Sequence, residues 1–97
     1  MSEVVSAVEH MVKVRVVHVN EVERVDFEEP RTATLKQVWD KAYVELKISP
    51  NRKDVFQTAG EHPKSLMAYL NLTLEQARDQ KVIDDYHFGI ASETGGA

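Results

Sequence analysis

Residues 34–46 read TLKQVWDKAYVEL, and this stretch decides the fold. Thr34 and Gln37 have the form of a capping box, the pair of side chains that opens a helix. Apolar residues then recur at helical spacing and form one continuous stripe; they are Leu35, Val38, Trp39, Ala42, Tyr43 and Leu46. Pro50 disfavours helix in the residue before it. The stretch therefore predicts one amphipathic helix with one face in a core.

The residues before this helix predict a β-hairpin. Residues 11–19 read MVKVRVVHV, in which valines alternate with Lys13 and Arg15, as is typical of a strand with one buried face. Residues 21–28 form a second β-rich stretch, which Pro30 ends because proline has no N–H to donate. Val14 and Val16 are expected to point into the core. Val17 and Val19 lie on the opposite face of the strand and are the alternative pair for the buried face. The helix must cover the apolar face of this hairpin.

After the helix, residues 54–59 predict a third strand that ends at Gly60. Residues 65–72 suit either a short strand or a helical turn. Thr73 and Gln76 repeat the capping-box form, which places a short helix at about residues 74–79. Residues 84–91 predict the last strand, with alternating apolar side chains. This order of elements predicts an α+β fold, in which a mixed sheet of about four strands packs on one main helix. The residues expected in its core are Val12, Val14, Val16, Val25, Phe27, Leu35, Val38, Trp39, Ala42, Leu46, Phe56, Phe88 and Ile90.

The two ends of the chain differ from the part between them. Residues 1–10 have no strong periodicity and predict a flexible N-terminal arm. Residues 11–91 are expected to form the folded domain. Residues 92–97 read SETGGA and contain nothing that builds a core, so they predict a flexible C-terminal tail.

The composition excludes several classes of function. The 97 residues allow one small domain, and the net charge of −4 argues against a non-specific nucleic-acid binder. The chain has no cysteine, which removes disulfides, thiolate zinc sites and a cysteine nucleophile. The first ten residues lack the pattern of a secretory signal, and no stretch has the roughly 20 apolar residues of a membrane helix. These features predict a cytoplasmic protein with no membrane contact.

The order of elements resembles that of ubiquitin-like β-grasp proteins. The residues that carry the resemblance are the VFQTAG stretch at 55–60, Thr73-Leu74 before the last strand, His87 within that strand, and Gly95-Gly96 near the end. The likeness covers residues 11–96 and is one of pattern rather than of high identity. Ubiquitin has Arg-Leu-Arg before its glycines, whereas this chain has Glu93-Thr94. The likeness therefore implies a bacterial-type ubiquitin-like modifier with enzymes of its own.

The resemblance implies that chemistry takes place at Gly95, Gly96 and Ala97. Glycines have no Cβ, so they thread a narrow enzyme channel without steric cost. A peptidase would remove Ala97, a separate activating enzyme would adenylate Gly96 with ATP, and a conjugating enzyme would pass it to an amine of a target protein. Two alternatives stay open. One is a sulfur carrier that forms a thiocarboxylate at Gly96; the other is a plain interaction domain that needs no tail.

The remaining candidates concern surfaces. His87 and Gly89 are predicted to share the exposed face of the last strand, where an uncovered glycine beside an exposed ring would suit a docking surface. Gln57 stands at the third-strand position, where ubiquitin presents an apolar residue to its readers. The four histidines have no metal-ligand spacing, and no G-x-S-x-G motif occurs. We therefore expect no metal site and no cofactor, and we expect that the chain is not itself an enzyme.

Overall fold

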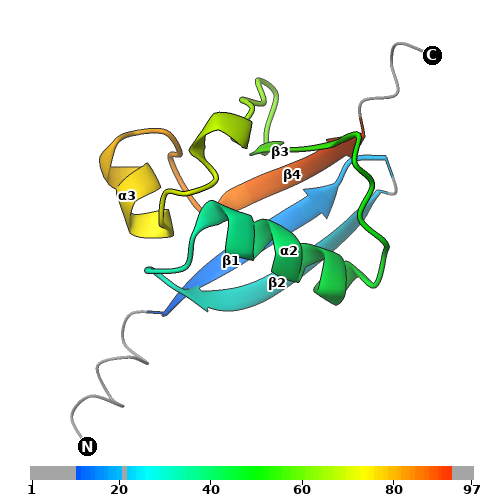
Figure 1. The fold of residues 1–97 in the computed structure, drawn as a ribbon, viewed down its shortest axis with the longest axis horizontal. Coiled ribbons are helices and arrows are strands. Elements are labelled where there is room, and N and C mark those ends of the chain that lie inside the picture. The colour runs from blue at the N-terminus through cyan, green and yellow to red at the C-terminus, as the bar shows by residue number, and fades with distance from the viewer. Residues whose placement is uncertain (1–10, 21, 93–97) are drawn as a thin grey trace, which may run out of the picture.

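The structure is a computed structural model that describes residues 11–20 and 22–92 (Figure 1). Its elements are β1 (Met11–His18), β2 (Glu23–Pro30), the helix α2 (Leu35–Leu46), β3 (Asp54–Thr58), the 3-10 turn η1 (Met67–Tyr69), the helix α3 (Leu74–Asp79) and β4 (His87–Ser92). The expected arm, residues 1–10, and residues 93–97 lie outside the described residues, so the predictions made for them stay predictions.

The four strands form one mixed sheet in the order β2-β1-β4-β3. β1 pairs with β2 and β3 pairs with β4 in antiparallel fashion, whereas the two central strands, β1 and β4, are parallel. The main helix α2 crosses one face of this sheet, and α3 lies beyond one end of it (Figure 1). The predicted α+β fold class, a mixed sheet with one main helix, is confirmed, and the arrangement is consistent with a β-grasp-like fold.

Both predicted capping boxes are present. Thr34 Oγ1 accepts the N–H of Gln37 at 3.1 Å, and Gln37 Oε1 accepts the N–H of Thr34 at 2.8 Å. Thr73 and Gln76 repeat the pair at the start of α3. These side chains satisfy backbone N–H groups that have no partner inside the helix. Of the two possibilities for residues 65–72, the structure contains a helical turn, namely η1.

The core lies between α2 and the sheet. Ten of its predicted members are buried: Val14, Val16, Phe27, Leu35, Val38, Ala42, Leu46, Phe56, Phe88 and Ile90. Three others were expected there but are only partly buried, and they pack around its edge; they are Val12, Val25 and Trp39. His18 follows Val14 and Val16 on the inner face of β1, where its side chain is only 6% exposed.

The connecting segment between β3 and β4 adds buried residues that the sequence analysis missed. They are Leu66, Leu74, Ala77, Val82 and Ile83. The segment joins the body through backbone bonds: the N–H of Leu35 donates to Leu72 O, and the N–H of Leu74 donates to Ala33 O, both at 2.9 Å. These contacts close the end of the core at which α2 begins.

Three aromatic rings run through the core. Phe56 on β3 stacks on Phe88 of β4 at 5.1 Å between ring centroids, and on Trp39 of α2 at 5.7 Å. Stacked rings add to the free energy gained from burial. They fix the helix against the two strands that carry the candidate site. In the part of the chain that the structure describes, no helix has the length and apolar composition needed to cross a membrane.

Candidate functional site

The first candidate site is the C-terminal end of β4, where the chain leaves the folded body. Ser92, the last residue of β4, is held from two sides. Its N–H donates to Asn20 Oδ1 at 2.8 Å, and its hydroxyl donates to Asp54 Oδ1 at 2.9 Å. Gly95, Gly96 and Ala97, the predicted reacting end, lie outside the described residues. Gly96 is the fourth residue after this fixed point.

A buried hydrogen-bond network holds Ser92 in place. Its centre is Asp54, which is 4% exposed. Besides Ser92, the Asp54 carboxylate accepts the Tyr43 hydroxyl at 2.7 Å and the N–H of Asn51 at 3.2 Å. Trp39 Nε1 in turn donates to the Tyr43 oxygen at 3.0 Å. Three donors compensate the carboxylate for its loss of water, so the network stabilises the body rather than offering a reactive acid.

The state of Tyr43 is consistent with that structural role. Burial raises the pKa of its hydroxyl well above the usual range, and the hydrogen bond to Asp54 raises it further. The phenol therefore stays protonated at neutral pH and stays a donor. Trp39 and Tyr43 were predicted to pack in the core. The bond from Tyr43 to Asp54 was not predicted, because the two residues lie on different elements, 11 positions apart.

A small hollow of about 290 Å³ borders this point of exit. The side chains that line it are mostly polar: His18, Asn20, Ile48, Ser49, Asn51, Asp54 and Ser92. Asn20 belongs to the turn after β1. The hollow is therefore built from the turn after β1, the loop before β3, and the two strand ends Asp54 and Ser92.

The second candidate site is the sheet face opposite α2. The strand register brings the three predicted docking residues together there: Gly89 is paired with Gln57 on β3, and His87 precedes Gly89 by two on the same face. However, Gly89 is buried. A Cβ at that position would lie 3.6 Å from Cγ of Gln57. The expected uncovered glycine is therefore wrong, because the Gln57 side chain lies across it.

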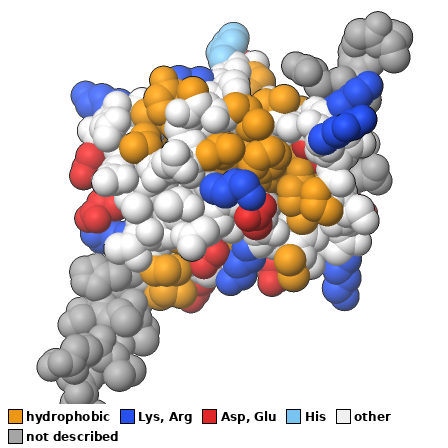
Figure 2. Space-filling model, viewed as in Figure 1, with side chains coloured by type: hydrophobic (Ala, Val, Ile, Leu, Met, Phe, Trp, Pro, Cys, Tyr) orange, Lys and Arg blue, Asp and Glu red, His pale blue; other side chains and the backbone are white. Residues whose placement is uncertain are grey.

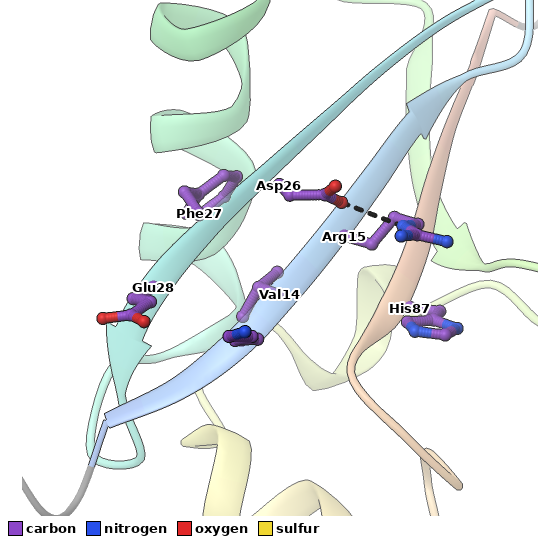
Figure 3. Close-up of a pocket in the computed structure, with 7 residues that line it drawn as sticks. Val14, Arg15, Asp26, Phe27, Glu28 and His87 are labelled. Atoms are coloured by element: carbon purple, nitrogen blue, oxygen red, sulfur yellow. Dashed lines mark hydrogen bonds and ion pairs between the residues drawn. The ribbon is translucent and has the colours of Figure 1, made fainter.

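A shallow hollow of about 440 Å³ extends from His87 toward β2 on this face (Figure 3). Its charged lining comes from Lys13, Arg15, Asp26, Glu28 and His87. Arg15 lies between Asp26 and His87, because the register pairs it with both. Arg15 Nε donates to Asp26 Oδ1 at 2.9 Å, and this bond lowers the pKa of the Asp26 carboxyl.

Arg15 and Asp26 were not among the site residues predicted from the sequence. The hairpin register carries the signal that could have found them, because it sets the two residues directly opposite each other. His87 is about half exposed, and its Nδ1 lies 3.6 Å from Asp85 Oδ2. The hollow thus mixes both signs of charge, which suits the recognition of a polar protein surface better than that of an apolar ligand.

The face that carries α2 has a different character. Figure 2 shows hydrophobic side chains near its centre, with Lys, Arg, Asp and Glu interspersed singly among them. Val44 of α2 is the most exposed large hydrophobic residue of the helices, at 71%. Among the described residues, the Lys and Arg side chains visible on this face do not form a stripe of the kind that tracks a nucleic-acid backbone.

Within residues 11–20 and 22–92, no group of three or more His, Asp or Glu side chains is arranged to hold a metal ion. No family model matches the chain, and no curated protein is significantly similar to it.

Proposed function

We propose that this chain is a ubiquitin-like protein modifier. Its Gly96 carboxylate, once Ala97 is removed, is activated with ATP by a separate enzyme and joined to an amine of a target protein. One observation carries the proposal: a central strand of a β-grasp-like body, β4, leads within four residues into Gly95-Gly96. The body would supply recognition, and the reacting carboxylate would lie beyond it.

The fixed position of Ser92 supports this proposal. An extended chain advances about 3.3–3.6 Å per residue, so Gly96 reaches no farther than roughly 14 Å from Ser92. The bonds of Ser92 to Asn20 and Asp54 fix the point from which this distance is measured. An enzyme that docks on the body therefore finds the carboxylate within a limited volume, which lowers the entropic cost of bringing the reacting groups together.

The proposed conjugation of Gly96 proceeds in four steps, namely hydrolysis, adenylation, thioester formation and transfer to an amine. A peptidase hydrolyses the bond between Gly96 and Ala97. The free Gly96 carboxylate attacks the α-phosphorus of ATP and releases pyrophosphate. A cysteine thiolate of the enzyme attacks the adenylate carbonyl and releases AMP, and a target amine then attacks the thioester and releases the thiol. The absence of a side chain on Gly96 leaves its carbonyl open to each nucleophile.

The test uses the full chain and a chain that ends at Gly96, each with ATP and the activating enzyme from the same genome. We expect the shorter chain to form an adenylate and then a thioester, and the full chain to do so only after peptidase treatment. Gly96→Val should abolish transfer, because branching at Cβ crowds the reacting carbonyl. Thr94→Val is the matched control, since Thr and Val have the same shape and position 94 is not the reacting one.

The alternatives give different results in the same experiment. A sulfur carrier would gain a C-terminal thiocarboxylate, visible as the mass change of one oxygen exchanged for sulfur, and would not become linked to a protein. A plain interaction domain would keep its biological activity without residues 94–97. If Gly96→Val or this deletion leaves the activity intact, both the modifier and the carrier proposals fail.

A further inference from the structure

The two edges of the sheet are treated differently, and this difference carries our further inference. The edge strands are β3 and β2. The outward backbone groups of an edge strand can pair with another strand, so proteins usually cover or interrupt them. The hydrogen bonds among residues 11–20 and 22–92 show that one edge is covered and the other is open.

The edge at β3 is covered by the loop that follows it. The N–H of Thr58 donates to Lys64 O at 2.9 Å, and the N–H of Leu66 donates to Phe56 O at 2.8 Å. Met67 Sδ accepts the N–H of Phe56 at 3.5 Å. The outward N–H groups of Phe56 and Thr58 and the outward carbonyl of Phe56 are therefore used inside the molecule.

The edge at β2 is open along its middle. Arg15 and Val19 of the β1 side direct their N–H groups to β4. By alternation, Val16 and His18 bond to their partners Val25 and Glu23 on β2. The backbone groups of Arg24 and Asp26 therefore point away from the sheet. Among the residues that the structure describes, none donates to or accepts from these groups. The outward carbonyl of Glu28 accepts a hydrogen bond from Lys41 Nζ at 3.5 Å, and no other described residue donates to it.

We propose that this edge pairs with the same edge of a second copy of the chain. The two β2 strands would run antiparallel about a two-fold axis at Val25 and join two four-stranded sheets into one. In this register Arg24 of each copy lies opposite Asp26 of the other, so the dimer contains two such pairs of opposite charge. Asp26 uses Oδ1 for Arg15, which leaves Oδ2 for the second copy.

Charge selects this register over its neighbours. A shift of the axis to Arg24 sets two arginines opposite each other. A shift to Asp26 sets Arg24 opposite Glu28 twice, but it also sets two aspartates directly opposite each other at the axis. A shift to Phe27 sets Asp26 opposite Glu28 twice. Like charges directly opposite each other destabilise a strand pair, whereas opposite charges stabilise it. Only the axis at Val25 pairs opposite charges without like ones among Arg24, Asp26 and Glu28.

The same axis also covers apolar surface. Val25 is only partly buried in the single chain and packs at the edge of the core. In the proposed pair, the two Val25 side chains meet at a non-hydrogen-bonded position, where side chains approach most closely. The contact is short, so we expect a weak dimer that forms at high protein concentration.

The test is a charge exchange, measured by sedimentation equilibrium of the full chain up to about 1 mM. We expect the unmodified chain to show a monomer–dimer equilibrium. Arg24→Glu and Asp26→Lys, each alone, should weaken it by about 10-fold or more, because each sets like charges opposite each other. An equimolar mixture of the two variants should restore dimers, since the mixed pair again has opposite charges at both positions.

Lys53→Glu, an exposed charge reversal away from β2, is the matched control and should leave the equilibrium unchanged. Recovery in the mixture also shows that both variants fold. The proposal is overturned if the unmodified chain stays monomeric at the highest concentration, if the mixture stays monomeric, or if Lys53→Glu weakens association as much as the edge variants do. None of these results depends on the modifier chemistry.

Discussion

The hydroxyl of Tyr43 on α2 donates a hydrogen bond of 2.7 Å to Oδ2 of Asp54, the first residue of β3. The other carboxylate oxygen of Asp54 accepts the hydroxyl of Ser92, the last residue of β4. One buried carboxylate thus connects the main helix to the point where the C-terminal residues leave the body. A substitution of Tyr43 is therefore expected to affect the position of Ser92, where the chain leaves the body.

Tyr43→Phe tests the network directly. The substitution removes one donor from a buried carboxylate and should lower the free energy of unfolding by about 1–3 kcal/mol. Tyr69→Phe is the control, because Tyr69 packs against the core and its hydroxyl makes no hydrogen bond within the described residues; it should change the free energy by less than about 0.5 kcal/mol. Urea unfolding measures both. Equal effects of the two substitutions would contradict the role given to the Tyr43–Asp54 bond.

The same residue predicts a dependence on alkaline pH. The pKa of Tyr43 is higher in the folded chain than in the unfolded chain. Its contribution to stability is therefore complete below the unfolded value of about 10 and is lost as the pH rises above it. We expect the free energy of unfolding to fall more steeply above pH ~10 in the unmodified chain than in Tyr43→Phe. If the free energy of unfolding falls equally steeply with pH in the two proteins, the pKa of Tyr43 is not raised by folding.

Two valines of α2 provide a matched test of the core. Val38 is fully buried, whereas Val44 is 71% exposed on the same helix. Val38→Ala should cost about 2–4 kcal/mol, because it removes buried methyl groups and leaves a cavity. Val44→Ala should change stability by less than about 0.5 kcal/mol. Thermal or urea unfolding separates the two, and a cost below about 0.5 kcal/mol at Val38 would contradict the assigned stripe.

The pair of Arg15 and Asp26 predicts an effect at acidic pH. The hydrogen bond from Arg15 holds the pKa of Asp26 below its unfolded value. The stabilisation is therefore present above an unfolded pKa of about 3.9 and is lost as the pH falls through the folded value. Arg15→Gln should raise the pKa of Asp26, as seen in an NMR titration of the carboxyl group. Arg52→Gln, remote from the pair in sequence, should leave it unchanged.

The environment of Gly89 predicts tolerance of a small side chain. A Cβ there makes ordinary van der Waals contact with Gln57. Gly89→Ala should therefore change the free energy of unfolding by less than about 1 kcal/mol, and the reduced freedom of the unfolded chain favours a gain. If Gly89→Ala instead destabilises the chain by several kcal/mol, the Gln57 side chain does not lie where the structure places it.

Much of the fold follows from local patterns in the sequence. The two capping boxes fix where α2 and α3 begin, because the bonds that define them join residues three positions apart. The buried residues of the connecting segment were missed because they lie on short elements, where periodicity has too few positions to show. The bond of Ser92 to Asn20 spans 72 positions, and only the parallel pairing of β1 with β4 brings its partners together.

For the candidate site too, residues were predictable from the sequence, whereas side-chain contacts between distant strands were not. The prediction for Gly95 and Gly96 depends on the resemblance of the chain to ubiquitin-like proteins, and it stays a prediction because both residues lie outside the described residues. The sequence places Gln57, His87 and Gly89 on one face, but it does not show that the Gln57 side chain lies across the glycine. Side-chain cover of that kind depends on the register between β3 and β4, which no local pattern specifies.

The parallel pairing of β1 with β4 has a mechanical consequence. Met11 begins β1 at one end of the sheet, and Ser92 ends β4 at the other (Figure 1). Tension applied between these two residues pulls the neighbouring strands lengthwise past each other, so the bonds between them resist as a group rather than opening one after another. The body should therefore withstand a larger load along this line than across β3 and β4, whose antiparallel bonds can peel apart singly from one end.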